Sequence, residues 1–296
     1  MSDPARDGEF PTGGPPGASS SGVALGEMRL HNRARARERV ALAQGVLWER
    51  YRLASAEEAF ELLRTASQAR NVKLNLLAEA VIATPGPATG AARWFPGRAS
   101  LPAPALSGLG LPPGDADAPL RTVLGSVLAR VTDIADTAMG NVQLVQGPWL
   151  RLEAHTGLDE EFTEYFAFVA QGTTACAEAA TSRAPVTIHD VVTAGVFSDQ
   201  ARRVILDAGS RACHSIPVLS PTGHLLAVMS THHRTALGEF TEGQAGGLGA
   251  TAEAAGAWLS WYRRTHVLNA LEHLHRQARP RVVAPRRSPE DRPGHE

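Results

Sequence analysis

The chain of 296 residues has few cysteines, few aromatic side chains and no long apolar run. Its two cysteines, Cys176 and Cys213, cannot form the framework of several disulfides that stabilises small secreted domains. No apolar run approaches the length of a membrane-spanning helix. The N-terminal segment also lacks the apolar core of a secretory signal. We therefore expect a cytoplasmic protein with no membrane contact.

Lysine is almost absent. Lys73 is the only lysine among the 29 lysine and arginine residues. The charges are unevenly distributed along the chain. Residues 27–83 carry ten basic and seven acidic side chains, a net charge of +3, whereas residues 120–265 carry ten and fourteen, a net charge of −4. An acidic domain does not attract nucleic acid non-specifically. Any contact with nucleic acid is therefore expected in the N-terminal part.

Motifs of catalysis and of structural metal sites are also missing. The sequence contains no G-x-S-x-G, no P-loop and no H-E-x-x-H. His189, Asp190 and Cys176 do not follow the spacing of a nucleophile and its base. No CxxC or HxxxH pair indicates a structural zinc site. We expect neither an enzyme nor a bound metal.

Segments rich in proline, glycine and serine divide the chain. Residues 1–26 and the Pro- and Arg-rich residues 279–296 are expected to be disordered tails. Residues 84–119 hold eight prolines and six glycines, which predicts a linker that is semi-rigid where the prolines cluster. Two domains remain, residues 27–83 and residues 120–278, as the length suggests.

The first domain is predicted to be a bundle of three short helices. Apolar residues recur at helical spacing over residues 40–51. Ser55 followed by Glu58 forms a capping box at the start of a second helix. Asn71 is the expected N-cap of a third helix, which Pro85 ends. Three helices with short connections form a compact bundle.

The second domain is predicted to be an α+β sandwich with an antiparallel sheet. An amphipathic helix opens it near residue 120, and a long alanine-rich helix over 241–278 closes it. Between them, Ser220–Gly223 has the composition of a type I turn inside a hairpin. Helices at both ends of an antiparallel sheet are typical of this architecture. Strands are expected at 141–146, 149–155 and 184–191, and in the hairpin over 211–233.

The closing helix carries an apolar seam with coiled-coil spacing. The seam alternates steps of four and three residues, the rhythm by which two helices pair. We expect a homodimer that forms through this seam. Its members are Leu248, Ala252, Ala255, Leu259 and Tyr262.

Three motifs in the first domain resemble those of the ANTAR family of RNA-binding regulators. They are AQGVL at 43–47, AFELLR at 59–64, and SQARNVKL with LAEA behind it at 67–80. The resemblance implies a transcription antitermination regulator that binds hairpin loops of a nascent transcript. Gln44 departs from the family, which often carries lysine there. The module also lies near the N-terminus, whereas relatives usually carry it at the C-terminus.

The candidate RNA contacts lie at the end of the second helix and the start of the third. Arginine and lysine neutralise phosphates, while serine, asparagine and glutamine reach the base edges of unpaired loops. The alternative is that these polar residues are only solvated helix ends. The predicted contacts are Arg64, Ser67, Gln68, Arg70, Asn71 and Lys73.

The second domain resembles the GAF family of sensor domains. The resemblance rests on APVTIHDV at 184–191, on the run VILDAGSRACHSIPVLSPTGHLLAVMSTHH at 204–233, and on the closing helix. It implies a pocket for a small molecule. Because relatives bind cyclic nucleotides, haem, bilins or iron, the ligand or cofactor stays open. Ala177 and Ala227 stand where many relatives carry glycine. The candidate ligand residues are Cys176, His214, His232 and His233; the alternative is that the cysteines are simply small buried residues.

Two functions from different classes follow. The first is an RNA-binding antitermination regulator in which the GAF-like domain senses a signal and controls RNA binding. The second is a signal-sensing interaction module whose helical bundle mediates dimerisation or partner binding without RNA. The surface from Arg64 to Lys73 discriminates between them, because RNA binding requires it to be exposed.

Overall fold

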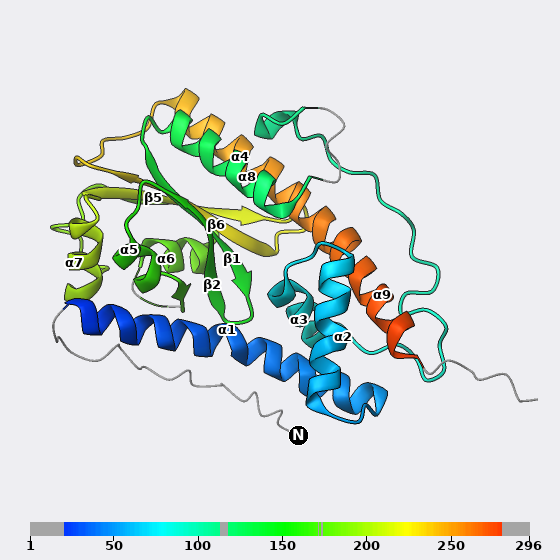
Figure 1. Ribbon diagram of the computed structural model, residues 1–296. Coiled ribbons are helices and arrows are strands. Elements are labelled where there is room, and N and C mark those ends of the chain that lie inside the picture. Colours follow the sequence, from blue (N-terminus) through cyan, green and yellow to red (C-terminus); the bar gives the residue numbers. More distant parts are fainter. Residues whose placement is uncertain (1–20, 113–117, 171, 173, 280–296) are drawn as a thin grey trace, which may run out of the picture.

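The computed structural model describes residues 21–112, 118–170, 172 and 174–279. N-terminal helices precede a six-stranded antiparallel sheet that is covered by helices, which confirms the predicted α+β fold (Figure 1). Most of the two predicted tails lies outside the described residues. Residues 21–26, predicted as tail, form the first turns of a helix. No helix among the described residues is long and apolar enough to cross a membrane.

The three predicted N-terminal helices are present. They are α1 (Ser21–Tyr51), α2 (Ala56–Ala69) and α3 (Leu74–Ala83). Ser55 caps α2 as predicted, because its side chain accepts from the Glu58 amide; the Glu58 carboxylate, however, accepts from the amide of Ala54 and not from that of Ser55.

The predicted cap of α3 is wrong. The residue before α3 is Lys73, and no side chain caps that helix. Asn71 instead has a φ of 48°. Asparagine tolerates this left-handed conformation better than most residues. Asn71 therefore reverses the chain after α2 and does not start α3.

The sheet has the strand order β3-β2-β1-β6-β5-β4. The predicted hairpin is confirmed as β5 and β6, with the Gly223 amide donating to the Ser220 carbonyl at 2.9 Å in the turn. The sequence did not predict β3, because a strand of two residues has no detectable alternation. The strands are β1 (Met139–Gln146), β2 (Trp149–Thr156), β3 (Phe168–Val169), β4 (Val186–Ile188), β5 (Ala212–Leu219) and β6 (Leu225–His233).

Helices cover both faces of this sheet and create two apolar cores. Side chains alternate across each strand. Ile216 and Cys213 of β5 are three positions apart, so Ile216 belongs to one core and Cys213 to the other. The first core contains α4 (Leu120–Ile134) and α8 (Glu242–Tyr262). The second contains α5 (Glu160–Tyr165), α6 (Ala175–Ser182) and α7 (Asp199–Asp207).

The closing helix leaves the sheet and enters the N-terminal bundle. After α8 the helix passes through a π-helical turn at Arg263–Val267 and continues as α9 (Leu268–Ala278). Leu271 and Leu274 of α9 are fully buried and belong to the same core as Leu63 and Leu77 of the bundle. Figure 1 shows α9 lying beside α2 and α3. The bundle thus has four helices, one of them from the second domain.

The seam predicted to pair two chains is buried within one chain. All five of its members are at most 6% exposed. They face the sheet, α4 and the adjoining segments of their own chain. The predicted role of this seam is therefore wrong, because an apolar helix stripe packs equally well against its own domain. The homodimer stays a prediction, and it requires another surface.

The segment between the domains is fixed to the closing helix over its described part, residues 84–112. The amide of Trp94 donates to the Glu272 carboxylate at 2.9 Å, and its indole donates to the Pro85 carbonyl at 2.9 Å. Further along, the indole of Trp261 donates to the Leu101 carbonyl at 3.0 Å. A short 3-10 turn, η1 (Ser107–Leu109), then packs on α8.

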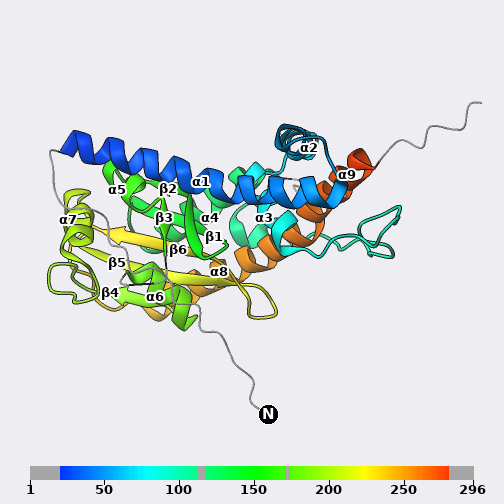
Figure 2. The same ribbon diagram turned by 90° about the horizontal axis from the view of Figure 1, so that it is seen from below.

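Helix α1 spans both domains. Figure 2 shows it lying along α5 and the sheet at one end and along the bundle at the other. Asn32 donates to the carboxylate of Glu164 on α5 at 2.8 Å. The guanidinium of Arg35 lies 4.2 Å from the centre of the Trp149 ring on β2. The two domains are therefore joined by α1 as well as by α9.

We predict that Gly256→Ala destabilises the whole chain. A Cβ at Gly256 would overlap the backbone carbonyl of Leu219 in β5. Backbone cannot yield as a flexible side chain does, so we expect a loss of about 2 kcal/mol or more in the free energy of unfolding. Gly249→Ala on the same helix is the matched control, because a Cβ there meets no atom within 4 Å. The control should gain stability, by about 0.5–1 kcal/mol. Equal denaturant midpoints for the two variants would contradict this account.

Candidate RNA interface and sensor cavity

The predicted RNA contacts do not form a single face. Arg64 and Gln68 lie one helical turn apart on the solvent side of α2, where Arg64 donates to Gln68 at 2.8 Å and pairs with Glu61 at 2.6 Å. Ser67 is buried, and its hydroxyl donates to the Val72 carbonyl at 2.7 Å. Ser67 therefore holds the connection between α2 and α3 and does not face solvent.

Lys73 is engaged by the sensor domain. Its ammonium group pairs with the carboxylate of Glu153 on β2, whose side chain is only 4% exposed. Asn75, in the first turn of α3, donates to Glu153 at 3.3 Å and to the amide oxygen of Gln146 at 3.0 Å. Arg151 adds a second cation 3.7 Å from Glu153. The start of α3 is thus clamped onto the β1–β2 hairpin.

The sequence analysis missed Glu153, Gln146 and Asn75 as partners of Lys73. Glu153 lies 80 positions from Lys73, so local spacing gives no signal for this contact. The alternation along β2 placed Glu153 on a strand, but not beside a helix of the other domain. The one observation that pointed here was the isolation of a single lysine in an arginine-rich chain.

Arg70 and Asn71 are exposed at the far end of α2. The guanidinium of Arg70 approaches the imidazole of His273 on α9, with 3.5 Å between Nη2 and Nδ1. The exposed candidates Arg64, Gln68, Arg70 and Asn71 therefore surround the end of α2 without forming one row. The structure brings a residue of the sensor's last helix into the same region.

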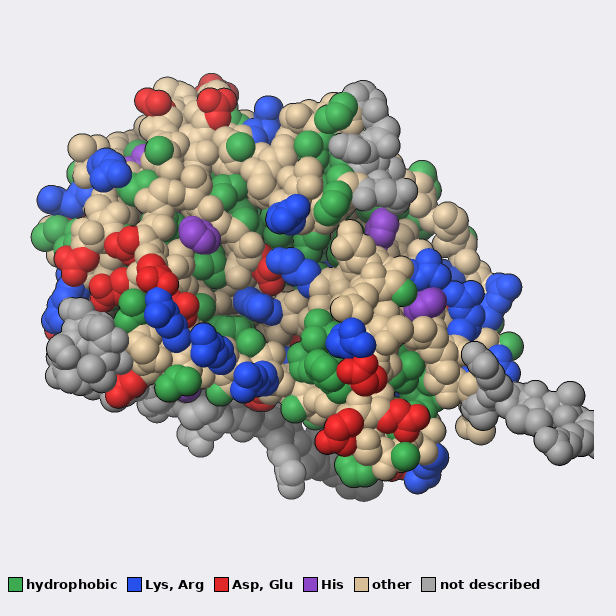
Figure 3. Space-filling view, in the orientation of Figure 1, with side chains coloured by type: hydrophobic (Ala, Val, Ile, Leu, Met, Phe, Trp, Pro, Cys, Tyr) green, Lys and Arg blue, Asp and Glu red, His purple; other side chains and the backbone are tan. Residues whose placement is uncertain are grey.

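A second basic surface lies on α1, and the sequence analysis did not single it out. Arg33 and Arg37 are exposed, and neither forms an ion pair with another described residue. Figure 3 shows basic side chains in a row over α1. Arg33 also lines a groove of about 690 Å³ between α1 and the β2–α5 region. Glutamates on α5 line the same groove, so its charge is mixed.

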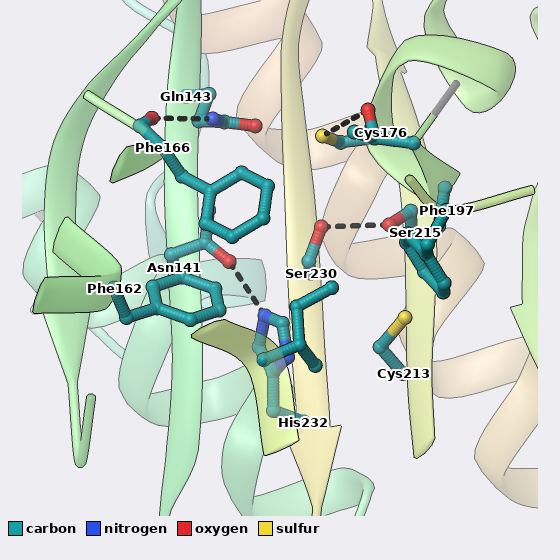
Figure 4. A pocket seen from close by; sticks show the side chains of 13 residues that line it. Asn141, Gln143, Phe162, Phe166, Cys176, Phe197, Cys213, Ser215, Ser230 and His232 are labelled. Atoms are coloured by element: carbon teal, nitrogen blue, oxygen red, sulfur yellow. Dashed lines mark hydrogen bonds between the residues drawn. The ribbon is translucent and has the colours of Figure 1, made fainter. Parts of the chain in front are cut away.

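The sensor domain contains a small cavity between the sheet and α5–α7. Its volume is about 30 Å³, enough for roughly one water molecule. Polar side chains from β1, β5 and β6 form one wall together with the Cys213 thiol of β5, and aromatic rings and the Cys176 thiol of α6 form the other (Figure 4). The side chains that line it include Asn141, Gln143, Phe162, Phe166, Cys176, Phe197, Cys213, Ser215, Ser230 and His232.

A hydrogen-bonded chain crosses the polar wall of this cavity. His232 contacts Asn141 Oδ1 through Nε2 at 3.1 Å and Ser210 Oγ through Nδ1 at 3.0 Å. Gln143 donates its amide to the Phe166 carbonyl at 3.1 Å, while its Oε1 has no partner among the described residues. An unsatisfied buried acceptor favours a donor from a bound molecule or a water.

Burial keeps the titratable groups of the cavity neutral. It lowers the pKa of His232 to about 3 and raises the pKa of Cys213 to about 12. Burial also raises the pKa of the Cys176 thiol, against an opposing hydrogen bond from Thr174. Thiols that stay protonated are weak nucleophiles and poor metal ligands. The cavity therefore offers neutral donors and acceptors beside aromatic rings.

The structure separates the four candidate ligand residues. Cys176 and His232 line the cavity, whereas His214 and His233 lie on the opposite face of the sheet around Phe240. The Thr187 hydroxyl contacts His214 Nδ1 at 2.8 Å. Consecutive histidines on one strand necessarily point to opposite faces. No group of three or more His, Cys, Asp or Glu side chains within the described ranges is arranged to hold a metal ion.

Comparisons with known families confirm both resemblances. Residues 28–82 match the family model of the ANTAR domain, and residues 119–257 match that of the GAF domain. A search of curated proteins gave no match.

Similar solved structures include three that cover the sensor region. One is the GAF domain of an Acinetobacter phosphoenolpyruvate-protein phosphotransferase, with 13% identity over 49% of this chain and 84% of that chain and a TM-score of 0.40. Another is a GAF domain/HD domain protein from Geobacter sulfurreducens, with 14% identity, coverages of 49% and 94%, and a TM-score of 0.42. A third is the free methionine-R-sulfoxide reductase from Neisseria meningitidis in complex with its substrate, with 18% identity, coverages of 48% and 79%, and a TM-score of 0.39.

We predict that stability falls as the pH decreases from about 6.5 to 5. Burial lowers the pKa of His232 to about 3 and that of His214 to about 4, both below the ordinary value near 6.5. The unfolded chain therefore takes up protons first. Each histidine's contribution is complete above pH 6.5 and declines below it, by up to about 1.4 kcal/mol per pH unit.

His232→Gln should remove one histidine's share of this slope. The measurement is urea unfolding of the wild type and the variant at several pH values, with pH 8 as the baseline where neither histidine titrates. Parallel curves for the two proteins between pH 6.5 and 5 would refute the assignment to His232.

Proposed function

We propose that this protein is an RNA-binding transcription antitermination regulator in the cytoplasm, in which the GAF-like domain senses a signal and controls the ANTAR-like bundle. The match of residues 28–82 to the ANTAR domain carries the proposal. The exposed Gln68, Arg70 and Asn71 and the partly exposed Arg64 support it, because they offer cations and amides to an RNA loop. We propose no catalytic step, since the buried thiols and His232 of the cavity are neutral.

The clamp at Lys73 suggests how the sensor exerts control. Glu153 of β2 neutralises the charge of Lys73 and so weakens its attraction for a phosphate. β2 pairs with β1, and β1 lines the cavity with Asn141 and Gln143. A molecule that changes the hydrogen bonds of this wall would shift the hairpin that carries Glu153. It would change RNA affinity only by its different affinity for the clamped and released states.

We propose that the ligand of the sensor is small and that the groups it presents to the cavity are uncharged. The unpaired Gln143 Oε1 accepts a donor, and the rings of Phe162, Phe166 and Phe197 provide apolar contact. The cavity holds about 30 Å³, so any ligand larger than water requires the walls to move.

We predict that the full chain binds RNA hairpins through the end of α2. The wild type should enrich particular sequences from a pool of RNA hairpins with randomised loops. For an enriched hairpin, Arg64→Gln and Asn71→Ala should each weaken binding by about 1–3 kcal/mol, and affinity should fall steeply with salt. Fluorescence anisotropy measures both effects.

The matched control is Arg203→Gln on α7, which removes an exposed arginine far from the bundle. It should bind as the wild type does. If no loop sequence is enriched over the starting pool, the interaction module without RNA becomes the better account. Circular dichroism of each variant checks that the helices are intact.

We further predict that Glu153→Gln increases RNA affinity. The substitution keeps the shape of the side chain and a hydrogen-bond acceptor for Asn75, but it removes the charge that holds Lys73. A freed Lys73 gains access to phosphate, so affinity should rise several-fold, and the gain should vanish in the double variant Glu153→Gln, Lys73→Gln. Glu178→Gln, which removes an exposed carboxylate on α6, is the control for net charge. An equal gain in the control would assign the effect to overall charge and not to the clamp.

A further inference from the structure

Two arginines from distant parts of the chain lie near the same histidine, His273, at the end of the bundle. Arg70 follows the last turn of α2, and Arg276 lies in the last turn of α9, and both are exposed. His273 lies one helical turn before Arg276 and contacts Arg70 through Nδ1. Burial lowers the pKa of His273, and the positive charges of Arg70 and Arg276 lower it further. Both guanidinium groups are therefore within electrostatic range of one imidazole.

No carboxylate among the described residues neutralises this pair. Neither Arg70 nor Arg276 forms an ion pair with another described residue. Glu272, the only acid on α9, accepts from the backbone amides of Trp94 and Phe95 at 2.9 and 3.2 Å. Glu61 on α2 is occupied by Arg64. Figure 3 shows basic side chains and a histidine gathered near the end of α9.

Two positively charged side chains that lie close together without a neighbouring carboxylate favour the binding of an anion. Guanidinium groups present planar forks of N–H donors that match phosphate oxygens. A neutral His273 accepts from Arg70 through Nδ1, so it orients that guanidinium without adding a charge of its own. It is a positioning residue for this pair.

We propose that Arg70 and Arg276 together bind the phosphate backbone of the RNA, so that the RNA interface is shared between the ANTAR-like bundle and the last helix of the sensor domain. This inference rests on the proposed function. It adds to that function a contact contributed by a helix outside the ANTAR-like module, residues 28–82. The isolated bundle would lack half of this site.

The shared site gives the sensor a direct route to the RNA. α9 continues from α8 through the π-helical turn at Arg263–Val267, and α8 lies against β5 at Gly256. A movement of the sheet displaces the same helix that carries Arg276, while Arg70 stays with α2. The spacing of the two guanidinium groups, and with it the fit to phosphate, then depends on the state of the sensor.

The test measures binding of the full chain to a hairpin enriched from the randomised-loop pool, over a range of salt concentrations. Arg276→Gln should weaken binding about 5- to 10-fold and lower the slope of log affinity against log salt by about one phosphate contact. Arg276→Lys keeps the charge and should retain the slope while losing part of the affinity, because the fork is absent. Thermal unfolding checks that both variants fold.

One control variant and two possible outcomes distinguish a failure of the shared site from a failure of the function on which it rests. Arg130→Gln removes an exposed arginine of α4 outside the bundle and should bind as the wild type does. If Arg64→Gln weakens binding while Arg276→Gln leaves it within two-fold of the wild type, the shared site is overturned and the proposed function stands. A wild type that enriches no hairpin would overturn the proposed function together with this inference.

Discussion

The burial of α9 against α2 and α3 is the constraint on which the rest of the structure depends. A bundle made of α2, α3 and the part of α1 that packs on them buries too small a fraction of its surface to be stable on its own. Leu271 and Leu274 supply the missing part of its core, since both are fully buried among bundle residues. Burial of each leucine contributes about 1.5–3 kcal/mol. The N-terminal domain therefore depends on the C-terminal end of the sensor for its stability.

This arrangement restricts the way in which a signal can travel. Release of one domain from the other would expose the apolar face of α9 and break the hydrogen bonds between the connecting segment and the closing helix, from the Trp94 amide to Glu272 and from the Trp261 indole to the Leu101 carbonyl. A smaller shift, in which α9 and the β1–β2 hairpin move against α2 and α3, keeps these contacts. The two polar junctions, Lys73 with Glu153 and Arg70 with His273, both start from the connection between α2 and α3, one reaching β2 and the other α9. Both change when the boundary moves.

The cavity of the sensor domain is small, and the residues around it are closely packed. Ala177 and Ala227 stand where many GAF relatives carry glycine, and both are almost completely buried. Neither alanine lines the cavity, and Ala227 belongs to the core on the other face of the sheet. Three phenylalanine rings, those of Phe162, Phe166 and Phe197, do line it, and its volume is about 30 Å³. A polar chain from Ser210 through His232 to Asn141 is complete without a ligand, and among the described side chains that line the cavity Gln143 carries a buried acceptor, Oε1, without a partner. The hydrogen-bonding groups of the cavity thus restrict the chemical nature of a ligand more than the cavity volume restricts its size.

The sequence by itself determined what depends on local patterns. Helical spacing, the Ser55 cap, the Ser220–Gly223 turn and the alternation of the strands predicted the bundle helices, the opening and closing helices and every strand but β3, because each involves residues close together in the chain. The short helices α5, α6 and α7 were not predicted. The motifs also identified both families. Tertiary structure alone decided the partners of those elements. An apolar stripe such as Leu248 to Tyr262 has no preference between a second chain and its own sheet, so the predicted seam was wrong. Lys73 and Arg70 find partners 80 and 203 positions away, and no local pattern encodes such a distance.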